Sequence, residues 1–189
     1  KRSYCFDARH ALENLSTVDD ILSCLKSFSG DYTYSHNFAC ADATCCKILE
    51  NNADNPLLTA VRTGDSPLNP GVNWEFKDSI VCVNSFVFSG NSTKAHEWIG
   101  NHARWDSYAN QMKLRGEKID FEIMKKIVSY YTGELPGDRE LGDIYNSKTQ
   151  QIIIYEPETG QLEVFFRPKG MAPQPAVPEF EKVNIDLEL

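Results

Sequence analysis

An apolar run at residues 79–88 is dominated by β-branched and aromatic side chains, a pattern that predicts a buried strand. We expect this strand to be central in a mainly antiparallel sheet. Asn84 interrupts the run with an amide, and an amide buried without a partner costs about 1–3 kcal/mol. Its side chain should therefore either bond to neighbouring backbone or present a donor to a substrate oxygen, and the pattern leaves both alternatives open.

A helical repeat follows this run and predicts a helix with Thr93 as its N-cap and its end near Arg115. Its apolar residues recur at spacings of three, four and seven and predict one core-facing stripe, formed by Trp98, Ile99, Trp105, Tyr108, Ala109 and Met112. Arg104 lies at the edge of this stripe, about 100° from Trp105 around the helix axis. Its guanidinium either lies along the surface or reaches into a cleft.

Two short helices are predicted near the start of the chain, at residues 7–14 and 17–28. The second has an apolar face, formed by Val18, Ile21, Leu22 and Leu25. Ser16 followed by Asp19 resembles a capping box, in which the side chain before the helix accepts from the backbone of its first turn. The apolar face predicts that these helices pack onto another element of the fold.

Strand patterns follow these helices. Residues 32–42 and 44–50 should form a hairpin, and the segment after them, rich in Asn, Asp and Pro, should contain a short strand at residues 57–61. Another strand is expected to start at residues 143–147. The Pro- and Gly-rich segment at residues 66–71 is predicted to be a loop.

After the central helix, Asp120 is the predicted N-cap of a further helix that runs to about Tyr131. Ile119 and Met124 are placed to form a hydrophobic staple around that cap. Residues 133–142 are predicted to be a loop.

The clearest hairpin in the sequence joins strands at residues 151–155 and 161–166. The turn between them, residues 156–160, has proline where a type I turn favours it and glycine at the left-handed position. The Pro-rich tail at residues 168–178 should be extended, and residues 180–189 either add an edge strand or stay loose. Helices and antiparallel strands that alternate in this order predict a layered α+β fold.

Length, charge and cysteine content narrow the class of protein. The 189 residues suit a single domain, and the formal net charge of −8 argues against binding nucleic acid or an anionic membrane surface. No apolar run approaches the ~20 residues that span a bilayer, so we expect a soluble protein, cytoplasmic or exported. The six cysteines form no paired zinc-binding spacing, and we expect mostly buried thiols, no metal and no cofactor.

Four short segments resemble one known family in their order and spacing. Residues 83–86 (VNSF) and 104–108 (RWDSY) resemble its T-N-x-F-like and S-x-x-R-F-like segments. Residues 9–20 resemble its R-x-x-L-E and S-V-D-E segments, and residues 36–42 (HNFACAD) precede a strand ending in glutamate, as in the family. Over residues 9–166 the chain thus resembles the choloylglycine hydrolase and penicillin-acyltransferase group of N-terminal nucleophile (Ntn) hydrolases.

This resemblance implies part of an αββα sandwich, with residues 1–189 as the C-terminal portion of a longer enzyme. Members hydrolyse linear amide C–N bonds or transfer the acyl group, and their nucleophile is an N-terminal cysteine whose own α-amino group handles the proton. Cys5 does not fit that role, because the sequence around it lacks the C-T-S or C-T-T start. The resemblance implies that Asn84 donates to the oxyanion and that Arg104 orients the nucleophile or the substrate.

The expected partners are a small-molecule amide substrate and the missing N-terminal portion of the same protein. The sequence leaves open which amide is the substrate and whether the reaction is hydrolysis or acyl transfer. It also leaves open the oligomeric state, and a homo-oligomer is one possibility. A second class of function also stays open. In it, the chain is a catalytically silent domain of the same fold that binds a ligand or a partner.

Overall fold

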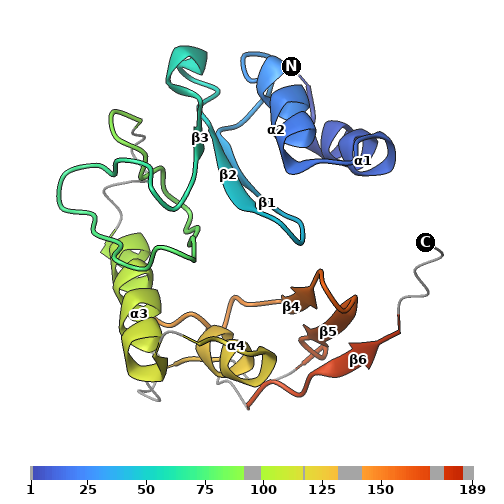
Figure 1. Ribbon diagram of the computed structural model, residues 1–189, viewed down its shortest axis with the longest axis vertical. Coiled ribbons are helices and arrows are strands. Elements are labelled where there is room, and N and C mark those ends of the chain that lie inside the picture. The colour runs from blue at the N-terminus through green and yellow to red at the C-terminus, as the bar shows by residue number, and fades with distance from the viewer. Residues whose placement is uncertain (1, 92–98, 117, 132–141, 171–176, 185–189) are drawn as a thin grey trace. The chain divides into compact units, whose positions relative to one another are not determined.

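The computed structural model describes residues 2–91, 99–116, 118–131, 142–170 and 177–184 (Figure 1). These residues form four α-helices, one short 3-10 helix and two three-stranded sheets in which every strand pair is antiparallel. The predicted α+β class is therefore confirmed. The chain divides into two compact units, Lys1–Asn101 and His102–Leu189, which are described in turn.

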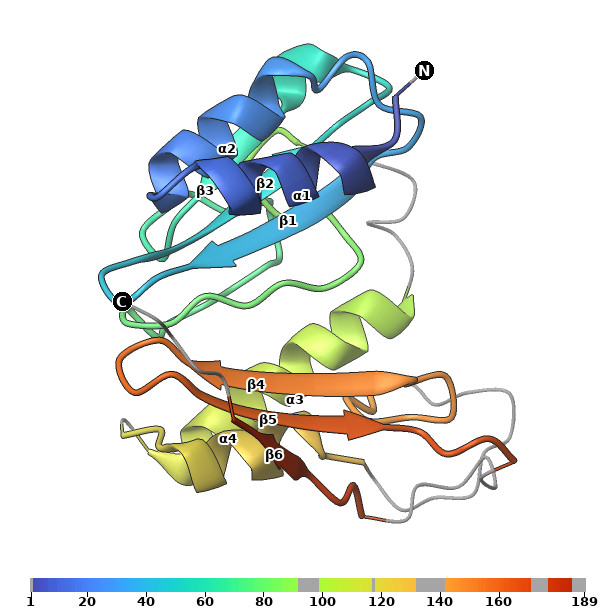
Figure 2. The ribbon, with the colours of Figure 1, turned by 90° about the vertical axis from the view of Figure 1, so that its right-hand side faces the viewer.

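The first unit has two helices on one face of a small sheet. The helices are α1 (Tyr4–Asn14) and α2 (Val18–Ser27), and the strands are β1 (His36–Ala41), β2 (Cys46–Asn51) and β3 (Ala60–Arg62), in the order β1-β2-β3. Figures 1 and 2 show α1 and α2 side by side across this face. The predicted apolar face of α2 is confirmed, because Val18, Leu22 and Leu25 pack with Leu49 of β2 in one buried cluster.

The start of α2 differs from the predicted capping box by one residue. Thr17, not Ser16, is the N-cap: its Oγ1 accepts from the Asp20 backbone N at 3.1 Å and donates to Asp20 Oδ2 at 2.7 Å. Val18 is only 3% exposed in the core below α2. Because Val18 must already be helical to reach that core, the extended capping position falls on Thr17.

The β1–β2 hairpin is confirmed, although β1 is shorter than predicted and begins at His36. Successive side chains of a strand point to opposite faces, and Phe38 packs against the α2 cluster while Asn37 points away from it. The predicted strand at residues 57–61 is only partly correct. Pro56 begins the 3-10 helix η1 (Pro56–Leu58), because its ring fixes φ in the helical range, and β3 starts only at Ala60.

The predicted central strand at residues 79–88 is wrong. Those residues have no regular secondary structure apart from an isolated bridge between Leu68 and Phe88. They lie on the face of the sheet opposite α1 and α2 (Figure 1). The run is apolar because it is buried there, with Val81, Val83, Phe86 and Val87 all at most 7% exposed. Apolar composition predicts burial, but it does not distinguish a strand from an irregular buried segment.

The second unit contains most of one helix, and it packs a second helix against a sheet around a core of its own. The elements are α3 (Ile99–Arg115, which begins at the end of the first unit), α4 (Phe121–Val128), β4 (Gln151–Glu156), β5 (Gln161–Phe166) and β6 (Glu181–Val183), and the sheet order is β4-β5-β6. Tyr145, Ile152, Ile154 and Phe165 form the buried cluster, with Phe121 and Val128 of α4 packed against it.

Several predictions for this unit are confirmed. Helix α3 ends at Arg115, and Asp120 caps α4 by accepting from the Ile123 backbone N at 2.8 Å. The hairpin β4–β5 has the predicted turn, in which Gly160 adopts a left-handed φ of 68°. An edge strand, β6, pairs with β5, and the staple between Ile119 and Met124 stays a prediction.

Other predictions need correction or lie outside the described residues. Helix α4 ends at Val128 rather than Tyr131. Residues 143–147 form bends and the start of a turn, not a strand. The backbone N of Tyr145 donates to the Tyr130 carbonyl oxygen at 3.0 Å, which anchors the segment to the residues just after α4. The predicted N-cap Thr93, the stripe residue Trp98 and nearly all of the loop at residues 133–142 are outside the described residues.

Candidate functional site

A buried ion pair lies beneath the irregular segment that carries Asn84. Arg62 Nε of β3 donates to Glu50 Oε1 of β2 at 2.9 Å, with 3% and 0% of the two side chains exposed. Arg62 Nη2 also donates to the Val81 carbonyl oxygen at 2.5 Å. The Glu50 carboxylate accepts from the backbone N–H groups of Val87 and Phe88 at 3.0–3.2 Å. Charges this deeply buried require such partners, and these bonds attach both ends of residues 81–88 to the sheet.

Two asparagines hold the backbone on either side of the Asn84 side chain. Asn37 Nδ2 of β1 donates to the carbonyl oxygens of Val83 at 2.9 Å and Ser85 at 3.1 Å. Asn101 Nδ2, in the first turns of α3, donates to the Asn84 carbonyl oxygen at 3.1 Å and to Ser85 Oγ at 2.7 Å. Three consecutive carbonyl groups are thus satisfied by side chains, which explains why this segment needs no neighbouring strand.

A second set of asparagines fixes the end of the same segment. Asn91 is 1% exposed, and its Oδ1 accepts from Asn52 Nδ2 at 3.0 Å. Asn69 Nδ2 donates to the Asn91 carbonyl oxygen at 2.8 Å, and Asn69 Oδ1 accepts from the Gly90 backbone N at 2.9 Å. Residues 81–91, hereafter the Asn84 loop, are therefore held over nearly their whole length by buried polar side chains.

Asn84 itself is exposed at the surface of this held loop. Its carbonyl oxygen is bonded to Asn101, but its side-chain amide makes no hydrogen bond to any residue that the structure describes. It lines an open hollow of about 1070 Å³, hereafter the Asn84 hollow. The walls come from the Asn84 loop, from residues 33–37 at the start of β1 and from residues 52–58 after β2. Among the described residues, no backbone group therefore engages the Asn84 amide, and its role as a donor to a substrate oxygen stays a prediction.

Two other lining residues could carry chemistry, but both are held in their neutral forms. Burial raises the pKa of the Cys82 thiol to about 11, so at neutral pH it stays protonated and is a poor nucleophile. Burial also lowers the pKa of His36, whose Nδ1 donates to the Tyr34 carbonyl oxygen at 2.8 Å. The Asn84 hollow therefore presents an exposed amide beside a thiol that is not activated for attack.

Arg104 belongs to α3 and to the second unit, whereas Asn84 belongs to the first. The Arg104 side chain is half-buried. This degree of burial does not decide between a guanidinium that lies along the surface and one that reaches into a cleft. Burial lowers the pKa of the Arg104 guanidinium below the usual 12.5, yet an arginine stays charged at neutral pH. The predicted stripe is confirmed at Trp105, which is 4% exposed, and Tyr108 and Met112 are half-buried beside it.

Sequence reasoning missed the residues that hold the site together. Asn37, Glu50, Arg62 and Asn101 all support the Asn84 loop, and none was predicted to do so. A signal existed for two of them. Glu50 follows an apolar strand without a break, and Asn101 lies four residues before Trp105, on the face of the helix that is buried.

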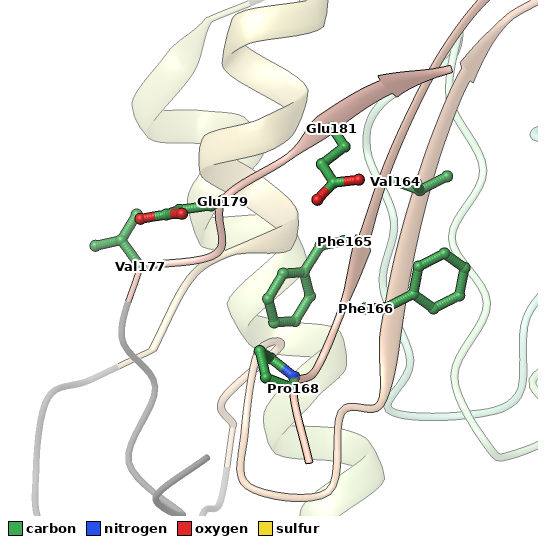
Figure 3. Close-up of a pocket in the computed structure, with 7 residues that line it drawn as sticks. All are labelled: Val164, Phe165, Phe166, Pro168, Val177, Glu179 and Glu181. Carbon is green, nitrogen blue, oxygen red and sulfur yellow. The ribbon is translucent and has the colours of Figure 1, made fainter. Parts of the chain in front are cut away.

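A second, smaller hollow lies in the second unit (Figure 3). Its volume is about 290 Å³, and its walls are β5, Pro168 and the segment that leads into β6. Five apolar side chains and the carboxylates of Glu179 and Glu181 line it, so its described lining holds neither a nucleophile nor a base paired with one. This hollow therefore offers less chemistry than the one around Asn84.

Within the described part of the chain, no cluster of three or more His, Cys, Asp or Glu side chains is arranged to hold a metal ion. All six cysteines are free thiols. A search of the described helices for one both long and apolar enough to cross a membrane finds none.

Comparison with known proteins finds no matching family model, no matching curated protein and no matching solved structure.

Proposed function

We propose that this chain is part of an enzyme that hydrolyses a linear amide C–N bond or transfers its acyl group, with Asn84 as the donor to the oxyanion. One observation carries the proposal. The Asn84 side chain is an exposed amide, bonded to none of the described residues, at a hollow large enough for a small amide and on a backbone fixed by Asn37 and Asn101. A preorganised donor of this kind stabilises developing negative charge without having to reorient during the reaction.

The proposed reaction proceeds through an acyl-enzyme. The α-amino group of the cysteine takes the thiol proton, and the thiolate attacks the amide carbonyl carbon. The carbonyl oxygen becomes an oxyanion that accepts a hydrogen bond from Asn84 Nδ2. The C–N bond then breaks, and the amine leaves with a proton from the α-amino group of the nucleophilic cysteine. Water, or an acceptor amine, attacks the thioester that remains and releases the acyl group. The Arg104 guanidinium, half-buried on α3, is proposed to orient the nucleophile or the substrate.

The nucleophile is proposed to lie outside this chain, as the N-terminal cysteine of a longer protein. Cys82 is unsuitable because its pKa is raised to about 11. Cys5 lies inside α1, so its backbone nitrogen is an amide and cannot act as the α-amino base. These two observations support the proposal that the attacking thiol comes from outside this chain.

The decisive experiment measures turnover of N-acyl amides by a longer protein that contains this chain behind an N-terminal cysteine. Asn84→Ala should lower kcat by ~10²–10³ with little change in KM, because the interaction forms mainly in the transition state. Ser89→Ala, an exposed change on the same loop, is the matched control and should leave kcat unchanged. Near-normal kcat in folded Asn84→Ala protein would remove Asn84 from the mechanism.

The second candidate function is a catalytically silent domain that uses the same hollow to bind a ligand. The neutral Cys82 thiol favours this reading, since the one thiol that lines the hollow among the described residues is not activated. The two functions separate cleanly. A longer protein that binds N-acyl amides at the Asn84 hollow without turning any of them over supports the silent domain.

A further inference from the structure

The Asn84 hollow has a definite charge balance. Among its described lining residues, Asp54 is the one carboxylate, and none is a lysine or an arginine. His36 adds no positive charge at neutral pH, because burial lowers its pKa. The described walls therefore carry at most one charge, and that charge is negative.

The polar groups that remain available in the hollow are neutral. The side chains of Asn84 and Asn55 are exposed, whereas the Asn52 amide is already engaged, with Nδ2 on Asn91 and Oδ1 accepting from the Asn55 backbone N at 2.9 Å. An anionic group that lost water in this hollow would meet neutral amides and the like charge of Asp54. A cationic group would instead be attracted by the Asp54 carboxylate, and a neutral group would meet no charge of its own sign.

We propose that the Asn84 hollow selects small linear amides that are neutral or positively charged, and that it discriminates against amides whose amine part carries a carboxylate or a sulfonate. The Asp54 carboxylate repels an anionic ligand. In addition, the described walls hold no cation that would compensate an anion for the hydration it loses on binding. This inference rests on the proposed function, because it takes the ligand of the hollow to be an amide.

Three probes of matched size test this selection in the full 189-residue chain. N-butyrylethanolamine is neutral, N-butyrylglycine is anionic, and mono-N-butyrylethylenediamine is cationic at pH 7. Each is smaller than the hollow, so its charge lies inside in either orientation. Titrations at low salt, followed by the ¹H–¹⁵N signals of residues 82–86 and of the Asn84 side chain, should give the order cationic, neutral, anionic in affinity. Steps of about fivefold are expected, as for unit charges ~4 Å apart in water.

Two variants and one control assign this order to the walls of the hollow. Asp54→Asn should abolish the preference for the cationic probe over the neutral one, while Asp65→Asn, at an exposed carboxylate outside the hollow, should leave it unchanged. Asp54→Lys replaces the one carboxylate of the described walls by a cation and should reverse the order in favour of N-butyrylglycine.

The outcomes separate the inference from the proposed function. If the anionic and cationic probes bind equally at the Asn84 signals, the charge selection is wrong and the amide site stands. If none of the three probes moves those signals, both the amide site and the selection are wrong. The predicted order together with its reversal in Asp54→Lys would establish the selection.

Discussion

Glu50 and Arg62 form an ion pair with 2.9 Å between Oε1 and Nε, and together they connect the first sheet to the Asn84 loop on both sides of Asn84. Neither side chain is more than 3% exposed. The pair lies on neighbouring strands, and its further bonds to backbone groups at positions 81, 87 and 88 replace a strand ladder. This arrangement makes the stability of the first unit and the geometry of the candidate site depend on the same two residues.

The first prediction concerns that ion pair. Glu50→Gln should lower the free energy of unfolding by about 3–5 kcal/mol, because it leaves the Arg62 charge buried without its counterion. Urea denaturation measures the loss. Glu13→Gln removes the exposed ion pair with Arg9 and is the control, with an expected cost below about 1 kcal/mol. A Glu50→Gln protein as stable as the control would show that the pair contributes little.

The second prediction concerns Asn37. Asn37→Asp removes the donor and sets a carboxylate against the carbonyl oxygens of Val83 and Ser85, so it should cost about 1–3 kcal/mol. Amide hydrogen exchange at residues 81–88 should accelerate more than exchange in α2. Uniform acceleration across the first unit would instead mean that Asn37 supports the whole fold and not specifically the Asn84 loop.

The third prediction is a pH dependence that comes from Cys82. Burial raises the pKa of this thiol from 9.0 to about 11, so the folded state holds the proton more tightly than the unfolded state does. The resulting stability is fully present below pH 9 and is lost as the pH rises from about 9 to 11. Unfolding measured across this range should show a steeper decline for the natural chain than for Cys82→Ala, since the other titrating groups are common to both proteins. Parallel curves would contradict the raised pKa.

The fourth prediction is that the purified 189-residue chain has no amidase activity. The Cys82 thiol is protonated at neutral pH, and the backbone nitrogen of Cys5 is an amide. Release of amine from an N-acyl substrate, followed over hours, measures this directly. Turnover abolished by Cys5→Ala would show that Cys5 is the nucleophile, and turnover unaffected by that change would require a different mechanism.

The fifth prediction concerns Arg104 in the longer protein. Arg104→Lys keeps the charge but loses the planar fork of donors, so turnover should fall if the guanidinium orients a carboxylate or the nucleophile. The melting temperature of the same variant separates this effect from a structural one. A variant with normal kcat and normal melting temperature would mean that the Arg104 guanidinium lies along the surface and takes no part in turnover.

The sequence by itself determined the elements whose signals are local. The apolar face of α2, the cap at Asp120, the β1–β2 hairpin and the Gly160 turn all follow from spacing and turn chemistry within a few residues. It also singled out Asn84, because an amide inside an apolar run is a local anomaly that needs a partner or a ligand.

Only the tertiary structure decided what the run around Asn84 becomes. Its apolar residues are equally compatible with a strand and with a buried irregular segment, and the outcome depends on which groups satisfy its backbone. Asn37 and Glu50 lie 37 or more positions along the chain from the backbone groups that they bind. The Asn37 amide and the Glu50 carboxylate occupy carbonyl and N–H groups that a neighbouring strand would otherwise pair. No local pattern encodes that choice, because it is made by hydrogen bonds between segments that only the fold brings together.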